Sequence, residues 1–170
     1  MVGQWNHCFA REMDEEYERH VISKFGLELC APTWWLNRRE ENDTYLFWDE
    51  YTGSFRLTPI AFASGTDLNK ELDQVEAKEA ASNPERKKFG DRVHVCYIQE
   101  NPKPEGGITR SHFYFSTLNG LLLVCSFSYD KELLEDEFSA DQVDAALEEV
   151  DLILDSIAVF SENGYDDDAP

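Results

Sequence analysis

Residues 108–129 read ITRSHFYFSTLNGLLLVCSFSY, and this stretch decides the fold. Two runs rich in β-branched and aromatic residues, 108–118 and 121–129, flank Asn119-Gly120, the dipeptide most typical of a type I′ hairpin turn. Residues 121–125 are apolar at every position, so both faces of this strand should be covered. The stretch therefore predicts a β-hairpin whose second strand lies at the centre of an antiparallel sheet.

Amphipathic helices are expected before and after this hairpin. Downstream, Ser139 is a candidate N-cap, and apolar residues recur at spacings of four and three from 143 to 157. Upstream, Asp67 is a candidate N-cap for a helix reaching about residue 82, where Asn83-Pro84 should end it. Each helix has one apolar stripe and a strongly acidic remainder.

Shorter β-prone runs complete the pattern. Further strands are expected at 21–29, 44–50, 54–63 and 92–99. Pro59 lacks an N–H donor, so its strand should be interrupted or lie at an edge there. Residues 37–43 should form a polar loop, and the basic cluster 86–88 should precede the strand that starts at residue 92.

The order of these elements predicts the fold class. It is α+β, an antiparallel β-sheet flanked by helices on both faces, that is, a three-layer α/β/α sandwich. We expect a single domain over residues 20–160. Residues 1–19 should form a partly helical N-terminal extension, and residues 161–170 an acidic disordered tail.

The charge of the chain restricts its partners. It has 35 acidic and 15 basic residues, a formal net charge of -20 in 170 residues, while its hydrophobic share of 42% is that of a folded protein. A field this negative repels nucleic acid and anionic membranes and favours a basic protein partner. The N-terminus lacks a basic region followed by an apolar run, so the expected location is cytoplasmic.

The sequence contains no recognisable cofactor or metal motif. Cys8, Cys30, Cys96 and Cys125 are scattered, form no C-x-x-C pair, and are expected to be core thiols in a reducing compartment. Glycine-rich phosphate loops are also missing, and His7-Cys8 is the only close-spaced pair of residues of the kind that a structural zinc site needs. We therefore expect no cofactor and no metal.

Catalytic residues are not expected either. The sequence has no G-x-S-x-G elbow, and its best nucleophile–base combination is Cys96 with His94, two apart on one face of a strand. A reactive thiolate needs positive surroundings, which this chain hardly supplies. We interpret Cys96 as a core thiol beside a half-exposed imidazole.

Partner-binding residues are sought among the aromatic and acidic side chains. Trp34 and Trp35 are adjacent, so in an extended segment they would face opposite ways, and an exposed one would be an interface anchor instead of core packing. The acidic side of the last helix adds further candidates. The candidate set is Trp34, Trp35, Asp141, Asp144, Glu148, Asp151 and Asp155.

Over residues 20–160 the pattern resembles the PsbP-like/DcrB-like fold group, in particular its small bacterial members described as domains of unknown function. The resemblance rests on Pro32-Thr33-Trp34-Trp35, which is similar to the group's P-x-W segment, on the two hairpins, and on a final helix ending at 154–157. It implies a sheet sandwiched between helices and a binding or adaptor role, with no catalytic residue to carry over. The missing export signal departs from the group's lipoprotein members.

Two functional hypotheses follow. The first is a non-enzymatic cytoplasmic binding protein that docks a basic partner, in its sharpest form an immunity protein against a cationic toxin. The alternative is a small-molecule-binding or assembly-factor module of the PsbP-like type, with a pocket lined by Trp34, Trp48 and Tyr97.

Overall fold

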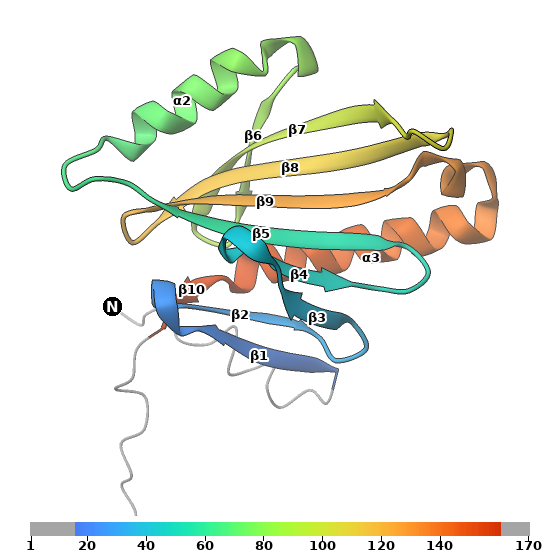
Figure 1. Ribbon diagram of the computed structural model, residues 1–170, viewed down its shortest axis with the longest axis horizontal. Helices are drawn as coiled ribbons and strands as arrows, with labels where there is room; N and C mark the ends of the chain where they lie inside the picture. Colours follow the sequence, from blue (N-terminus) through green and yellow to red (C-terminus); the bar gives the residue numbers. More distant parts are fainter. Residues whose placement is uncertain (1–15, 161–170) are drawn as a thin grey trace, which may run out of the picture.

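The computed structural model describes residues 16–160, which form two antiparallel sheets and two α-helices (Figure 1). The α+β class and the antiparallel pairing are thus confirmed. The expected tail at 161–170 lies outside the described residues, as does the expected extension up to residue 15. The domain boundary placed at residue 20 falls inside the first strand.

The larger sheet has seven strands in the order β3-β4-β5-β9-β8-β7-β6. The central position belongs to β9, as the sequence predicts. Side chains of β9 alternate between two apolar clusters, with Leu123 in one and Leu122 in the other. The strands are β3 (Leu36–Arg39), β4 (Tyr45–Trp48), β5 (Gly53–Ala61), β6 (Glu85–Phe89), β7 (Arg92–Pro102), β8 (Ile108–Leu118) and β9 (Leu121–Asp130).

The β8–β9 hairpin has the predicted turn. Asn119 and Gly120 both have positive φ, 50° and 77°, as a type I′ turn requires, and Leu118 pairs directly with Leu121. The expectation for Pro59 is also met, because β4 pairs with β5 only as far as Leu57. At Pro59, β5 therefore pairs with β9 alone, and no strand on its other side requires the N–H that proline lacks.

The smaller sheet corrects the expected strand at 21–29. That segment is split between β1 (Tyr17–Ile22) and β2 (Leu27–Pro32), which pair with each other, and β2 also pairs with β10 (Ala158–Val159). Gly26 has a φ of 62° and ends the short 3₁₀ turn η1 (Ser23–Phe25) between β1 and β2. This left-handed residue reverses the chain, so the continuous apolar pattern does not form one strand.

Two edge strands were not foreseen. Part of the expected polar loop at 37–43 is β3, followed by the 3₁₀ turn η2 (Glu41–Asp43), and the basic cluster 86–88 lies within β6. All four residues of β3 are exposed, and β6 is exposed except for its last residue. Edge strands of this kind are specified by backbone pairing and carry charge that prevents further association, so they lack the alternating pattern of a half-buried strand.

The two helices begin at acidic caps. In α2 (Leu68–Lys78) the predicted cap Asp67 accepts hydrogen bonds from the backbone N–H groups of Asn69 and Lys70. In α3 (Glu137–Ser156) the cap is Asp136, whose carboxylate accepts from the N–H and the hydroxyl of Ser139, so the expected start at Ser139 is wrong. The 3₁₀ turns η3 (Ala80–Ser82) and η4 (Lys131–Glu135) follow α2 and precede α3, respectively.

The helices pack on different parts of the molecule (Figure 1). The helix α3 runs beside β2 and along the large sheet, where it buries Val143, Val150, Ile153 and Leu154 in the main core. The helix α2 contacts β7 and β8, where Leu72 joins a smaller apolar cluster. Neither is long and apolar enough to cross a membrane, and the same holds for every helix within residues 16–160.

Candidate functional site

The strongest electrostatic feature is a row of carboxylates along α3. This helix contains no lysine or arginine. Its acids at 141, 144, 148, 151 and 155 are three or four residues apart, so they share one side of the helix. We call this row the acidic stripe, and its members are Asp141, Asp144, Glu148, Asp151 and Asp155. The first four are exposed and Asp155 is half-buried, so the stripe faces solvent.

Most basic side chains in the described part of the chain pair with acids outside the stripe. Within residues 16–160 no stripe carboxylate lies within 4.0 Å of a basic group. Ten basic residues instead form ion pairs with acids outside the stripe. They are Arg19, Lys24, Arg38, Arg39, Arg56, Arg86, Lys87, Lys103, Arg110 and Lys131. The distribution of ion pairs, and not acidity alone, thus singles out the stripe.

The C-terminal half of the stripe opposes the helix dipole. Carboxylates near a helix C-terminus are unfavourable, and α3 has no basic residue in its last turn. Arg92 of β7 compensates: its guanidinium donates to the Leu154 carbonyl at 2.6 Å and also to that of Ile157. Burial lowers the pKa of Arg92 from its ordinary value, and the carboxylate of Asp155 opposes that shift. A cation from the sheet therefore caps the helix, while within residues 16–160 the stripe carboxylates form no ion pair.

Asp151 reports the electrostatic surroundings of the stripe. Its pKa is raised above the ordinary value, mainly by partial burial and further by the like charge of Glu148, while Lys87 opposes both effects. An external cation placed here would relieve this repulsion. The stripe is therefore suited to bind basic groups.

The two tryptophans behave as their adjacency predicts. Trp35 is 4% exposed and stacks on Phe127 with ring centroids 6.1 Å apart, whereas Trp34 is 51% exposed. Trp34 lies 6.3 Å from the ring of Tyr17, whose hydroxyl donates to Glu149 of α3 at 2.8 Å. Glu149 follows the stripe residue Glu148 by one position, about 100° around the helix. The structure therefore brings the five acids together, whereas Trp34 lies against Tyr17, which bonds to a different side of α3, and Trp35 lies in the core.

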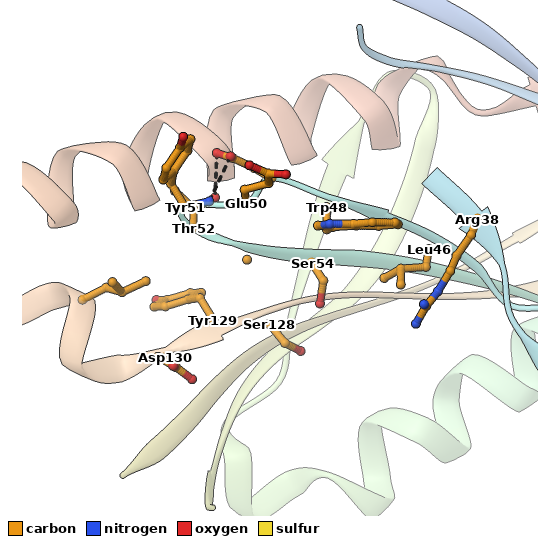
Figure 2. A pocket seen from close by; sticks show the side chains of 13 residues that line it. Arg38, Leu46, Trp48, Glu50, Tyr51, Thr52, Ser54, Ser128, Tyr129 and Asp130 are labelled. Atoms are coloured by element: carbon orange, nitrogen blue, oxygen red, sulfur yellow. Dashed lines mark hydrogen bonds between the residues drawn. The ribbon is translucent and has the colours of Figure 1, made fainter. Parts of the chain in front are cut away.

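A shallow, open pocket of about 600 Å³ lies at the β4–β5 hairpin (Figure 2). Figure 2 shows Arg38 at one end, Glu50 and Asp130 at the other, and Trp48 and Ser54 between them. The remaining side of the pocket comes from the end of β9 and from η4. The pocket is lined by, among others, Arg38, Leu46, Trp48, Asp49, Glu50, Ser54, Ser128, Asp130 and Leu133.

Local hydrogen bonds hold the turn that forms the acidic end of this pocket. The Asp49 carboxylate accepts from the backbone N–H of Tyr51 and the hydroxyl of Thr52, each at 3.1 Å (Figure 2). Gly53 allows the turn to approach β9, since a Cβ there would lie 2.5 Å from the Ser128 carbonyl oxygen. The turn is thus fixed by its own residues, and Glu50 stays exposed without an ion-pair partner in the described part of the chain.

The pocket differs from the one expected from the sequence. Of the three residues named for it, Trp48 lines it, but Trp34 and Tyr97 do not. Trp48 lies on β4 and Tyr97 on β7, with three strands between them in the sheet order. Ser128 and Asp130 were missed because β9, distant in the sequence, supplies them, while Asp49, Glu50 and Ser54 lie in the same hairpin as Trp48. The one usable signal was the Asp49-Glu50-Tyr51-Thr52-Gly53 turn beside an aromatic strand.

Cys96 and His94, the nucleophile–base pair considered from the sequence, are both buried in the core. His94 is fully buried, not half-exposed, and burial lowers its pKa to about 4. Burial likewise raises the pKa of Cys96 to about 11, so the thiol stays protonated at neutral pH. The Cys96 thiol points to the backbone oxygen of His94 at 3.7 Å, and among residues 16–160 neither ring nitrogen of His94 has a hydrogen-bond partner. These two groups carry no catalytic arrangement.

The cysteines require a second correction. Cys96 and Cys125 are free and buried, as expected for core thiols. Cys30, expected to be a thiol as well, is disulfide-bonded, and its partner lies outside the described residues. Across residues 16–160, no three His, Cys, Asp or Glu side chains are placed to hold a metal ion together.

Comparison with known proteins relates the chain by its fold. No protein-family model and no curated protein sequence matches it. A solved structure from Bacteroides thetaiotaomicron VPI-5482 has a TM-score of 0.67 at 17% identity, covering 86% of this chain and 50% of that one, so this chain spans half of its length. Cyanobacterial PsbP (CyanoP) from Synechocystis sp. PCC 6803 has a TM-score of 0.56 at 15% identity, covering 85% of this chain and 93% of that one. These similarities show that the chain has a PsbP-like fold.

Proposed function

We propose that this chain is a non-enzymatic protein-binding module that docks a basic protein partner through the acidic stripe of α3. The observation that carries the proposal is the row of five carboxylates with no ion-pair partner in the described part of the chain. Such a row attracts a basic protein over distances of about one Debye length, roughly 10 Å at moderate salt, and then pairs with its Lys and Arg side chains.

The packing of α3 supports this use. The helix is anchored by buried apolar residues on its opposite side and by Arg92 at its end, so its carboxylates are held on a rigid element. Exposed aromatic side chains lie at the N-terminal end of the same helix and at the neighbouring hairpin: Phe138 is 70% exposed and Tyr51 is 73% exposed. Aromatic anchors beside a charged row are typical of binding interfaces.

In its sharpest form, the proposal is an immunity protein that neutralises a cationic toxin. Such a protein needs fast capture and steric occlusion of the toxin's active site, and no chemistry of its own. Electrostatic steering by the acidic stripe would give the fast capture. The 20-residue helix α3 would give a surface long enough to cover an active site.

The pocket at the β4–β5 hairpin favours the alternative, a small-molecule-binding or assembly-factor module of the PsbP-like type. Under the same alternative, we propose that the chain is related to the DcrB-like, small bacterial members of that fold group. So does the three-layer α/β/α arrangement, supported by the alternation of Leu122 and Leu123 between the cluster that contains α2 and the cluster that contains α3.

The proposed cytoplasmic location competes with the disulfide at Cys30, because disulfides are rare in a reducing cytosol. The number of free thiols decides between the two: the native cells are lysed directly into a denaturing alkylating solution, and the alkylated cysteines of the protein are counted. Cytoplasmic protein should give four reactive thiols after denaturation. Two, from Cys96 and Cys125 alone, would place the protein in an oxidising compartment.

The binding proposal is tested by affinity capture from the native lysate at about 50 mM and about 500 mM salt, since screening weakens exposed charge pairs. The bait is the wild-type chain, the stripe variant Asp144→Asn/Glu148→Gln/Asp151→Asn, or a control with the same change in net charge. The control is Glu41→Gln/Glu71→Gln/Glu105→Gln, which leaves the stripe intact.

A basic protein held at low salt by wild type and control, but lost by the stripe variant, is the expected result. The same protein is then purified and its Kd measured against all three baits. Equal affinity for stripe variant and control would show that net charge alone governs binding, and the docking proposal would fail.

A further inference from the structure

The pocket at the β4–β5 hairpin combines features that single acidic residues elsewhere lack. Its lining has three carboxylates, Asp49, Glu50 and Asp130, against one guanidinium, that of Arg38. Arg38 forms an ion pair with Glu40 at 3.3 Å, and Glu40 also pairs with Arg56, so the charge of Arg38 is partly compensated from outside the pocket. The acidic end is therefore left with an excess of negative charge.

The three carboxylates are not equivalent. Asp49 uses both oxygens within the turn, and Asp130 forms an ion pair with Lys103 at 3.0 Å. Glu50 is exposed, has no ion pair within residues 16–160, and lies at the pocket wall. Glu50 is thus the carboxylate left to receive a cation from outside the molecule.

An aromatic surface lies next to this charge. The guanidinium carbon of Arg38 lies 5.7 Å from the ring centroid of Trp48, so this indole already takes part in a cation–π contact. Leu46 and Leu133 add apolar surface to the lining. Trp48 itself is half-buried and shares the exposed face of the sheet with its cross-strand neighbour Leu36, which is 46% exposed.

We infer that this pocket receives a cationic side chain, arginine or lysine, of the basic protein partner. The aliphatic stem of such a side chain contacts Trp48 and Leu133, and its charged head pairs with Glu50. Charge complementarity favours this occupant, because an acidic or purely apolar group would leave Glu50 without a counter-ion. The Ser54 hydroxyl already accepts from Arg56 and the Ser128 hydroxyl is bonded to that of Ser111, so each offers only its remaining lone pair to the N–H donors of the cation.

This inference rests on the proposed function only in taking the partner to be basic. It adds a specific anchor point, on the sheet side of the molecule, to the diffuse attraction of α3. The site is tested with small probes, so its outcome does not depend on finding the partner.

The experiment is an NMR titration of the full chain with Nα-acetyl-arginine amide and Nα-acetyl-lysine amide. The neutral Nα-acetyl-norleucine amide, of similar length, is the control ligand. Backbone amides of Gly53, Ser54 and Ser128 and the indole N–H of Trp48, assigned with Trp48→Phe, are followed. Saturable shifts confined to these signals, with both cations and not with norleucine, are expected.

Two variants carry the charge argument. Glu50→Gln should weaken binding of the arginine probe about two- to fivefold, the range of one exposed charge pair. Glu41→Gln removes the same charge at an exposed site outside the pocket lining and should leave the affinity unchanged. Neither change touches a buried group, so both variants should fold.

Equal shifts with norleucine would overturn the cationic assignment, and shifts spread along α3 instead of the hairpin would overturn the site. Probe binding at the hairpin without capture of any basic protein would leave the pocket standing and remove the proposed function. Capture that depends on the stripe, without probe binding at the hairpin, would leave the proposed function standing and overturn the pocket as a cation site.

Discussion

The helices α2 and α3 are both acidic and amphipathic, yet their carboxylates are used differently. Arg86 of the edge strand β6 bonds to Asp73 at 2.6 Å and to Glu76 at 2.8 Å, so acids of α2 attach that helix to the sheet. Within residues 16–160 the stripe of α3 has no such partner, and this helix is held by apolar packing instead. Acidity therefore has a structural use in α2 and is left available for binding in α3.

The difference in apolar burial explains how α3 packs firmly although its stripe forms no ion pair with the other described residues. Its buried residues include Val143, Val150, Ile153 and Leu154, whereas Leu72 is the one buried residue of α2. Each large aliphatic side chain that is fully buried contributes about 1.5–3 kcal/mol, much more than an exposed ion pair. A helix anchored in this way tolerates uncompensated charge on its other side.

The largest expected effect breaks that anchoring. Ile153→Ala should destabilise the protein by about 2–5 kcal/mol, since Ile153 is fully buried in the main core. Leu72→Ala, at the smaller cluster under α2, should fall at the low end of the range, about 2 kcal/mol. Urea unfolding of both variants measures the two free energies, and a larger loss for Leu72→Ala would reverse the comparison.

Acid should weaken the α3 side of the molecule through His94. The pKa of this buried imidazole is about 4 in the folded protein, below the ordinary 6.5, so the unfolded chain binds the proton more tightly. Stability from this group is complete above pH 6.5 and falls as the pH drops to 4, by about 3 kcal/mol in total.

The measurement is the free energy of unfolding from pH 7 to pH 4 for wild type and His94→Leu, so that carboxylate titrations cancel in the difference. The variant should lose less stability over this interval. Parallel curves would show that His94 does not titrate between the two states.

A smaller effect tests the ion pairs of α2. Arg86→Met should cost less than about 1 kcal/mol, because the guanidinium and both carboxylates are partly exposed. Hydrogen exchange should nevertheless accelerate in α2 and stay unchanged in α3. Equal acceleration in both helices would mean that Arg86 supports the whole fold and not one helix.

The smallest effect has the opposite sign. The stripe variant Asp144→Asn/Glu148→Gln/Asp151→Asn should raise stability by a few tenths of a kcal/mol, because like charges three or four apart on a helix repel. The gain should shrink at high salt, where screening already weakens the repulsion. Thermal unfolding at two salt concentrations measures it. A loss of stability would show that these acids have structural partners.

Local signals were read correctly where neighbouring residues decide the geometry. Asn119-Gly120 forms the predicted turn, Asp67 caps α2, and the apolar run at 121–125 lies in the central strand. The edge strands β3 and β6 were missed, because exposed polar residues carry no alternation and become strands only by pairing with a neighbour. Gly26 split a run that looked continuous.

The proposed binding surfaces divide in the same way. Helical spacing was enough to predict that the five acids of the stripe share one side of α3. The adjacency of Trp34 and Trp35 was enough to predict that they face opposite ways, with one of them exposed. Composition also determined the strongly negative charge. Each of these properties depends on residues a few positions apart, so the sequence by itself determined them.

Only the tertiary structure decided which charges are paired and where a pocket forms. Arg86 reaches α2, Arg92 reaches the end of α3, and Ser128 comes to lie beside the hairpin that carries Trp48 and Glu50. These contacts join segments distant in the sequence, and their formation depends on the order of strands in the sheet. The energy of a charge depends on its neighbours within a few ångströms, and it is the fold that supplies those neighbours.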